Sequence, residues 1–268
     1  MELALPGLSF LTSSIPLKFD TDGCTTSFQP ATGSASGTEH VLVLTNIQAG
    51  MFGLRSIKGV FLFDTISVPD NITVPAIYDG RQDLGGKRVL ILMLNGWGDM
   101  IHIQPALRTF YEKAVSSGSP PWITLGCNWM HNFPYQGVPY IQDVCPNIMT
   151  LKDLSEFDLL INLIPVNHQR SRHKSMKDLC FEVMKLNGEN QDTFLPSIGP
   201  NTARVARFKP VLEQIKEDTG KKLLCVNWKS RFPHKNAQPS LFFEAVKELS
   251  KDYQSVLFKD AEPAKIMQ

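Results

Sequence analysis

Three short clusters in this sequence carry side chains suited to chemistry on a charged or hydroxylated substrate. The first is Asn95-Gly96-Trp97-Gly98-Asp99, in which a carboxylate follows two glycines. Glycines permit a tight turn and the close approach of a backbone to a ligand. A carboxylate held at such a turn can take a proton from a hydroxyl group as a general base. Asp99 is therefore a candidate catalytic residue, while the competing interpretation is an ordinary helix N-cap.

The second cluster is a loop with several basic side chains, and it spans 227–235. Cationic groups on a loop can stabilise the charge that develops on a departing diphosphate, although a solvated basic turn is the commoner case. The third is a single acid, Glu262, which follows an expected strand near the last residues of the sequence. A surface acid is the equally plausible alternative for Glu262.

The elements that must position the first cluster can be predicted from its flanks. The run from Arg88 to Leu94 is almost wholly apolar without alternation, which is typical of a parallel strand buried on both faces. After the glycines, Ile103, Leu107 and Phe110 recur at helical spacing. The pattern predicts a strand, a glycine loop and a helix, which together form the first half of a βαβ unit. Ligands of open α/β sheets bind at the carboxyl ends of such strands.

Further βαβ elements follow this one along the chain. Apolar runs predict two more strands, and a periodic segment predicts a helix, within a first Rossmann-like domain spanning 87–196. A second, shorter domain is expected over 197–268, with two strands that flank one helix. The expected elements are the strands Trp122–Leu125, Phe157–Ile164, Lys222–Asn227 and Ser255–Lys259, and the helices 173–187 and Pro239–Tyr253.

The part of the chain before the first domain has a different composition. Residues 1–38 are rich in serine, threonine and glycine without periodicity, which predicts a disordered or loosely packed segment. Residues 39–86 hold three short β-branched or aromatic runs and then a turn-rich linker. We expect this segment to form a small β appendage.

Composition excludes several classes of protein. The 268 residues are 43% hydrophobic and 20% charged, with a net charge of +1, so no global field favours nucleic acid. The five cysteines are scattered and form no Cys-x-x-Cys pair, so neither a zinc site nor a disulfide framework is indicated, and we expect a reducing cytoplasm. No metal motif appears, and we predict no metal and no cofactor. No apolar run approaches the ~18 residues of a membrane span.

The residues from Asn95 to Leu107 resemble the N-terminal signature of glycosyltransferase family 9, the ADP-heptose:lipopolysaccharide heptosyltransferases and their relatives. The shared features are Gly98-Asp99, a few apolar residues, and Pro105-Ala106-Leu107 on the helix. Trp97 departs from the family, which usually has a smaller residue there. The strand Asp158-Leu159-Leu160-Ile161-Asn162-Leu163 is also similar to a family strand of the form Asp-Leu-x-Ile-Asn-Leu.

This resemblance implies an α/β protein of the GT-B kind, with two Rossmann-like domains and the small N-terminal β appendage beside them. The implied function is an inverting glycosyltransferase that moves a sugar, such as heptose, from a nucleotide-diphosphate sugar to a saccharide acceptor such as a lipopolysaccharide core. The implied location is the cytoplasm, with at most peripheral contact with the inner face of the membrane.

The resemblance also assigns roles to residues. Asp99 would be the catalytic base, and an acceptor-side loop would surround it. Ser230 and Lys235 fit the spacing of a phosphate-contacting loop in the family, and Glu262 fits a donor-binding glutamate. The acceptor-side residues would be Asn95, Gly96, Trp97 and Gly98.

Two alternative functions are compatible with the sequence, and the second domain bears on one of them. Family members continue beyond the second strand of this second domain, so we expect that domain to be incomplete here. A non-catalytic scaffold without a complete donor site is therefore one alternative function. A dinucleotide-dependent oxidoreductase is disfavoured because Asn95-Gly96-Trp97-Gly98-Asp99 lacks the third glycine of Gly-x-Gly-x-x-Gly.

Overall fold

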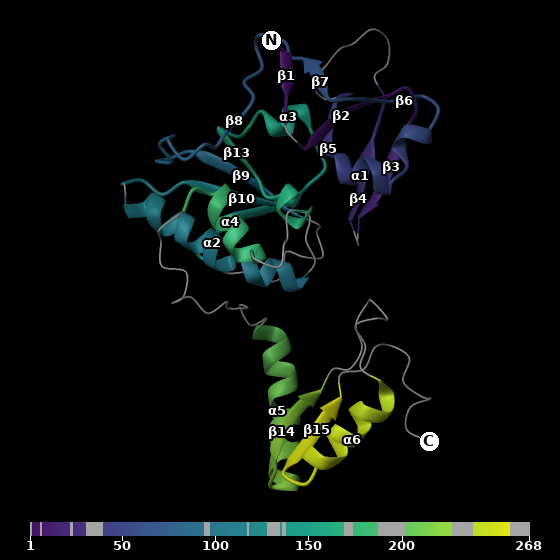
Figure 1. Ribbon diagram of the computed structural model, residues 1–268, viewed down its shortest axis with the longest axis vertical. Coiled ribbons are helices and arrows are strands. Elements are labelled where there is room, and N and C mark those ends of the chain that lie inside the picture. Colours follow the sequence, from purple (N-terminus) through teal and green to yellow (C-terminus); the bar gives the residue numbers. More distant parts are fainter. Residues whose placement is uncertain are drawn as a thin grey trace. The chain divides into compact units, whose positions relative to one another are not determined.

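A computed structural model shows two compact units, Met1–Gly199 and Pro200–Gln268. Each unit is described by itself (Figure 1). The structure describes residues 2–5, 7–21, 24–30, 40–93, 97–116, 118–127, 135, 138–168, 174–186, 202–226 and 238–257.

The first unit is built on a five-stranded parallel sheet, as the unbroken apolar runs predict. Its strand order is β11-β10-β9-β13-β8, and every neighbouring pair is parallel. The central strand, β9, is buried on both faces, with Val89, Leu90 and Ile91 fully covered. The strands are β8 (Ala76–Ile77), β9 (Arg88–Leu92), β10 (Trp122–Cys127), β11 (Asp143–Pro146) and β13 (Leu159–Asn162).

The two faces of this sheet are covered by different kinds of structure. Alternate residues of β9 such as Ile91 face α2 (Trp97–Ser116) and α4 (Met176–Val183), which contact each other. Leu90 faces the opposite way, into a core formed with Phe10 and other residues from the first part of the chain. The parallel sheet is therefore an inner layer, which explains why its strands lack polar alternation.

The second face is covered by a four-stranded sheet with the order β12-β5-β2-β6 and antiparallel pairing throughout. The far side of this sheet buries Leu11 and Leu44 against a hairpin and α1. The strands are β2 (Leu8–Ser13), β5 (Leu42–Thr45), β6 (Val60–Phe63) and β12 (Met149–Thr150). The hairpin is β3 (Leu17–Thr21) with β4 (Cys24–Phe28), and α1 spans Asn46–Met51.

Short elements complete the first unit. β1 pairs with β7 as a separate antiparallel ribbon. Leu151 and Leu154 of α3 pack in the same hydrophobic core as Leu90 of the parallel sheet. Their bounds are β1 (Glu2–Ala4), β7 (Thr65–Ser67), α3 (Leu151–Leu154), and the 3-10 helices η2 (Leu54–Ser56) and η5 (Ile164–His168).

The expectation of a disordered or loosely packed segment at 1–38 is wrong for its described part. Residues 2–28 contribute β1 to β4, and Phe10 and Leu11 are fully buried on opposite faces of β2. The serines and threonines of this segment lie among alternating apolar residues that pair with strands from later in the chain. Composition alone did not show that pairing, because the partner strands are distant in sequence.

The segment 39–86 is likewise not a separate appendage. Its strands β5 and β6 share one sheet with β2 and β12. Its last strand, β8, joins the parallel sheet beside β13, with Ala76 opposite Leu159. The described strands before residue 87 therefore belong to the first unit: β2 and β5 share a hydrophobic core with the central sheet, and β8 is part of that sheet.

The second unit contains a parallel pair, β14 (Lys222–Val226) and β15 (Tyr253–Leu257), connected through α6 (Pro239–Leu249). It begins with a helix that the sequence analysis did not predict, α5 (Thr202–Thr219). The helical spacing of Leu241, Phe242, Ala245 and Leu249 predicts that this face of α6 is buried, but the face is only partly covered. Phe242 and Val246 are half-buried, but Leu241 and Leu249 are 61% and 43% exposed.

Candidate active site

The described part of the first candidate cluster, at Gly98 and Asp99, follows the central strand β9 at the point where the order of the parallel strands reverses. From β9 the chain runs outward to β10 and β11, and it then returns to place β13 on the other side of β9. The carboxyl ends of these two strands are neighbours, because Leu92 is the register partner of Asn162 and Leu163 N–H donates to the Leu92 carbonyl at 2.9 Å. Such a switch point is the usual ligand site of an open α/β sheet.

Asp99 lies in the first turn of α2, the helix that follows β9. Its side chain is half-buried, Gly98 before it is exposed, and Met100 after it is fully buried. Asp99 is thus inside the helix, so a simple N-cap does not describe it. A carboxylate in the first turn interacts favourably with the positive end of the helix dipole.

Two buried side-chain amides support the backbone just after β9. Asn147 follows β11, and its Nδ2 donates to the Met93 carbonyl at 3.1 Å. The Asn147 side chain in turn accepts a hydrogen bond from Gln48 Nε2 at 2.9 Å. Gln48 and Asn147 are 2% and 3% exposed, so both amides are satisfied by each other and by the backbone rather than by solvent.

The start of α2 is held in a similar way. The Tyr135 hydroxyl donates to the Met100 carbonyl at 2.5 Å, and burial raises the pKa of that hydroxyl well above its ordinary value. Tyr135 therefore remains a neutral donor at physiological pH. Buried hydrogen bonds therefore reach Met93, just after β9, and Met100, in the first turn of the helix.

The thiols near this edge of the sheet are not suited to nucleophilic catalysis. Burial raises the pKa of Cys127, at the end of β10, to about 12. Burial also raises the pKa of Cys145, on β11, to about 12, and the carboxylates of Asp143 and Asp153 contribute to that increase. Both side chains stay protonated at neutral pH, and a protonated thiol is a poor nucleophile and a poor metal ligand.

Several predicted site residues lie outside the described part of the chain. These are Asn95 and Gly96, the side chain of Trp97, and the three predicted donor-binding residues Ser230, Lys235 and Glu262. Within the described residues, no group of three or more histidine, cysteine or acidic side chains is placed to hold a metal. No helix in those same residues is both long enough and apolar enough to cross a membrane.

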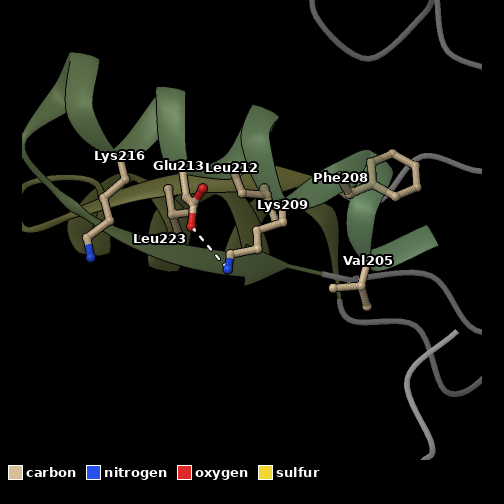
Figure 2. A pocket seen from close by; sticks show the side chains of 7 residues that line it. All are labelled: Val205, Phe208, Lys209, Leu212, Glu213, Lys216 and Leu223. Carbon is tan, nitrogen blue, oxygen red and sulfur yellow. Dashed lines mark ion pairs between the residues drawn. The ribbon is translucent and has the colours of Figure 1, made fainter. Parts of the chain in front are cut away.

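A shallow groove of about 370 Å³ lies on the second unit, between α5 and β14 (Figure 2). Its walls are mainly apolar, from Val205, Phe208, Leu212 and Leu223, with the Lys209–Glu213 ion pair at 3.8 Å along its rim. None of the predicted site residues lines this groove. Its composition suits packing against apolar surface better than binding a phosphate.

The supporting roles of Gln48, Asn147 and Tyr135 were not predicted from the sequence. Asn147 and Tyr135 are polar residues with no motif around them. The buried amides are separated by 99 positions in sequence, so no local pattern relates them. The signal that could have indicated Gln48 is the Thr45-x-x-Gln48 capping box at the start of α1, whose two hydrogen bonds are both present.

The fold is similar to that in a crystal structure of a glycosyl transferase family 9 protein from Veillonella parvula DSM 2008. The TM-score is 0.50 at 15% sequence identity, over 66% of this chain. The match spans 64% of the length of that protein, which is less than two thirds of it. No family model matches this sequence, and no curated protein does. The likeness is therefore one of fold: a mixed α/β protein with a parallel sheet.

Proposed function

We propose that this chain is an inverting glycosyltransferase that transfers a sugar from a nucleotide-diphosphate donor to a hydroxyl group of a saccharide acceptor. The observation that carries the proposal is the position of Asp99, half-buried in the first turn of α2 at the switch point of the parallel sheet. The fold-level likeness to a glycosyl transferase family 9 protein supports it. In its more specific form, the proposal names heptose as the transferred sugar and lipopolysaccharide as the acceptor.

In this proposal the acceptor hydroxyl attacks the anomeric carbon of the donor from the face opposite to the diphosphate. Asp99 takes the hydroxyl proton, the new glycosidic bond forms, and the bond to the diphosphate oxygen breaks with its electron pair leaving on the diphosphate. Ser230 and Lys235 would stabilise the charge on that leaving group, and Glu262 would hold donor hydroxyls. The acceptor would lie over Asn95–Gly98.

The test is release of nucleoside diphosphate from a panel of nucleotide sugars, in the presence of saccharide acceptors. Asp99→Asn should reduce turnover by at least about a hundredfold, in line with the usual contribution of a general base. Its helix content and melting temperature should stay close to those of the unaltered chain. Glu112→Gln is the matched control, because Glu112 lies on the same helix in an exposed ion pair with Arg108. Its turnover should not change.

Thermal shift with ADP, UDP, GDP and NAD provides a second, independent measurement. A ligand that binds only the folded state raises the melting temperature. Stabilisation by one nucleoside diphosphate but not by NAD is expected. Stabilisation by NAD alone, or full turnover in Asp99→Asn, would contradict the proposal.

A further inference from the structure

The outer strand of the antiparallel sheet, β6, has an unusual surface for a sheet edge. β6 ends the order β12-β5-β2-β6, and among the described strands it pairs only with β2. Strands at sheet edges are normally protected by charged residues, proline or bulges, since their free backbone groups can pair with another chain. Val60-Phe61-Leu62-Phe63 contains neither a charge nor a proline.

The two phenylalanines of β6 are not covered by the rest of the unit. Val60 and Leu62 turn toward the core beneath the sheet, and Phe61 and Phe63 point to the other face. Phe63 is 42% exposed, whereas Phe10, directly opposite it on β2, is fully buried. Phe61 is 54% exposed. Other residues of the unit therefore cover this face of the sheet as far as β2, and they leave Phe61 and Phe63 partly exposed at the edge.

The charges at the two ends of β6 are opposite in sign. Lys58 lies in the turn just before the strand, and Asp64 follows it directly, with both side chains exposed. Exposed Arg55 adds a second positive charge near the first end, where it helps to line a hollow of about 360 Å³ beside β6. When two such strands run antiparallel, the basic end of each lies next to the acidic end of the other.

We propose that β6 pairs antiparallel with β6 of a second copy of this chain, forming a two-fold symmetric dimer with one continuous sheet. The symmetry makes each Lys58 a neighbour of the other copy's Asp64, so the charges favour this partner and this direction. The four phenylalanines lie on one face of the joined sheet, where aromatic cross-strand neighbours stabilise pairing. The proposal is independent of the glycosyltransferase function.

The experiment is sedimentation velocity of the full chain over a range of concentrations. The unaltered chain should form dimers as concentration rises. Phe61→Lys should weaken association by about tenfold or more, since it places a charge on the edge strand. Met51→Ser is the control, because Met51 is an apolar residue that is 73% exposed but lies on α1 and not on β6. It should leave association unchanged.

Charge reversal provides the sharper test. Lys58→Asp and Asp64→Lys should each weaken self-association, because each homodimer would then bring like charges together. An equimolar mixture of these two variants should recover association, since every end-to-end contact in the mixed dimer again joins opposite charges. This recovery also shows that both variants are folded.

Three outcomes would overturn the proposal. The first is a chain that stays monomeric at every concentration. The second is a mixture of the charge variants that associates no better than either variant alone. The third is association that is lost in Phe208→Ser but kept in Phe61→Lys, which would place the contact on the apolar groove of the second unit, where Phe208 is 55% exposed.

Discussion

Gln48 Nε2 donates a 2.9 Å hydrogen bond to Asn147 Oδ1 and thereby joins the first layer of the chain to the end of the central strand. Asn147 Nδ2 in turn donates to the Met93 carbonyl at 3.1 Å. Met93 is the last described residue before the predicted glycine loop. Both amides are buried, so the loss of either one leaves the other without its partner. The Met93 carbonyl is therefore held by residues that are far from it in sequence.

Asn147→Ala should lower the free energy of unfolding by about 1–3 kcal/mol, the usual cost of leaving buried polar groups unsatisfied. Chemical denaturation of the whole chain measures this. Asn71→Ala is the control, because Asn71 is exposed, and it should change stability by no more than about 0.5 kcal/mol. Equal stability of Asn147→Ala and the unaltered chain would show that the amide network contributes little.

Gly126 on β10 is required by close packing rather than by its backbone conformation. A Cβ placed there would lie 2.6 Å from Leu92 Cδ2 on the adjacent strand. We expect Gly126→Ala to destabilise the chain by about 1–3 kcal/mol through overpacking, and the added substitution Leu92→Ala to cost less in that background than it does alone.

Gly50 provides the comparison for Gly126, since nothing lies within 4 Å of a Cβ built there on α1. Gly50→Ala should stabilise the chain by roughly 0.5–1 kcal/mol, because alanine is the better helix former. If both glycine substitutions shifted the denaturation midpoint in the same direction, the packing argument for Gly126 would be wrong.

The start of α4 should respond to pH in a defined direction. Hydrogen bonds from the Ser175 hydroxyl and backbone N–H lower the pKa of Asp178 below 3.8. A carboxyl group with a lowered folded-state pKa contributes stability above its unfolded pKa and loses it as the pH falls through the folded value. Asp178→Asn should therefore lower the melting temperature at neutral pH and have a smaller effect below pH 3.8.

Ser175→Ala serves as the reference for this pH dependence. It should cost about 0.5–2 kcal/mol at neutral pH, as expected for loss of an N-cap. Part of that cost should persist in acid, because the Ser175 hydroxyl also accepts from Asp178 N–H at 3.2 Å, a bond that does not titrate. An Asp178→Asn effect that grows in acid would contradict the assigned direction.

Thiol labelling should separate the cysteines by burial. Cys225 is exposed on β14, while Cys127 and Cys180 are buried. With a disulfide reagent under native conditions, Cys225→Ser should remove one rapidly reacting thiol. Cys127→Ala should leave the rapid phase unchanged, because a thiol with a pKa of about 12 presents almost no thiolate at neutral pH. Rapid labelling that Cys127→Ala removes would show that the end of β10 is open.

Donor binding is tested by Lys235→Ala. If Lys235 contacts the diphosphate, its loss should weaken ADP binding by roughly 1.5–3 kcal/mol, the range for hydrogen bonds to charged groups. Isothermal calorimetry against ADP measures the change, and Lys247→Ala, on the exposed side of α6, is the matched control. Unchanged ADP affinity in Lys235→Ala would remove that residue from the proposed site.

The sequence by itself determined the central part of the first unit. The apolar run from Arg88 to Leu94 predicts a buried strand, and the structure has β9 at Arg88–Leu92. The helical spacing of Ile103, Leu107 and Phe110 predicts a helix, and the structure has α2 there. The sequence pattern predicts these elements because both faces of the strand and one face of the helix are buried. The polarity of each residue therefore matches its burial.

Only the tertiary structure decided what the first 86 residues do and where the ends of the strands lie relative to each other. β2, β5 and β12 form one sheet although they come from distant segments, and Gln48 reaches Asn147 across 99 positions. In the second unit, Leu241 has the spacing of a core residue yet is 61% exposed. Such outcomes depend on which surfaces contact each other. A side chain gains the free energy of burial only where another segment covers it, so one segment's sequence does not determine that free energy.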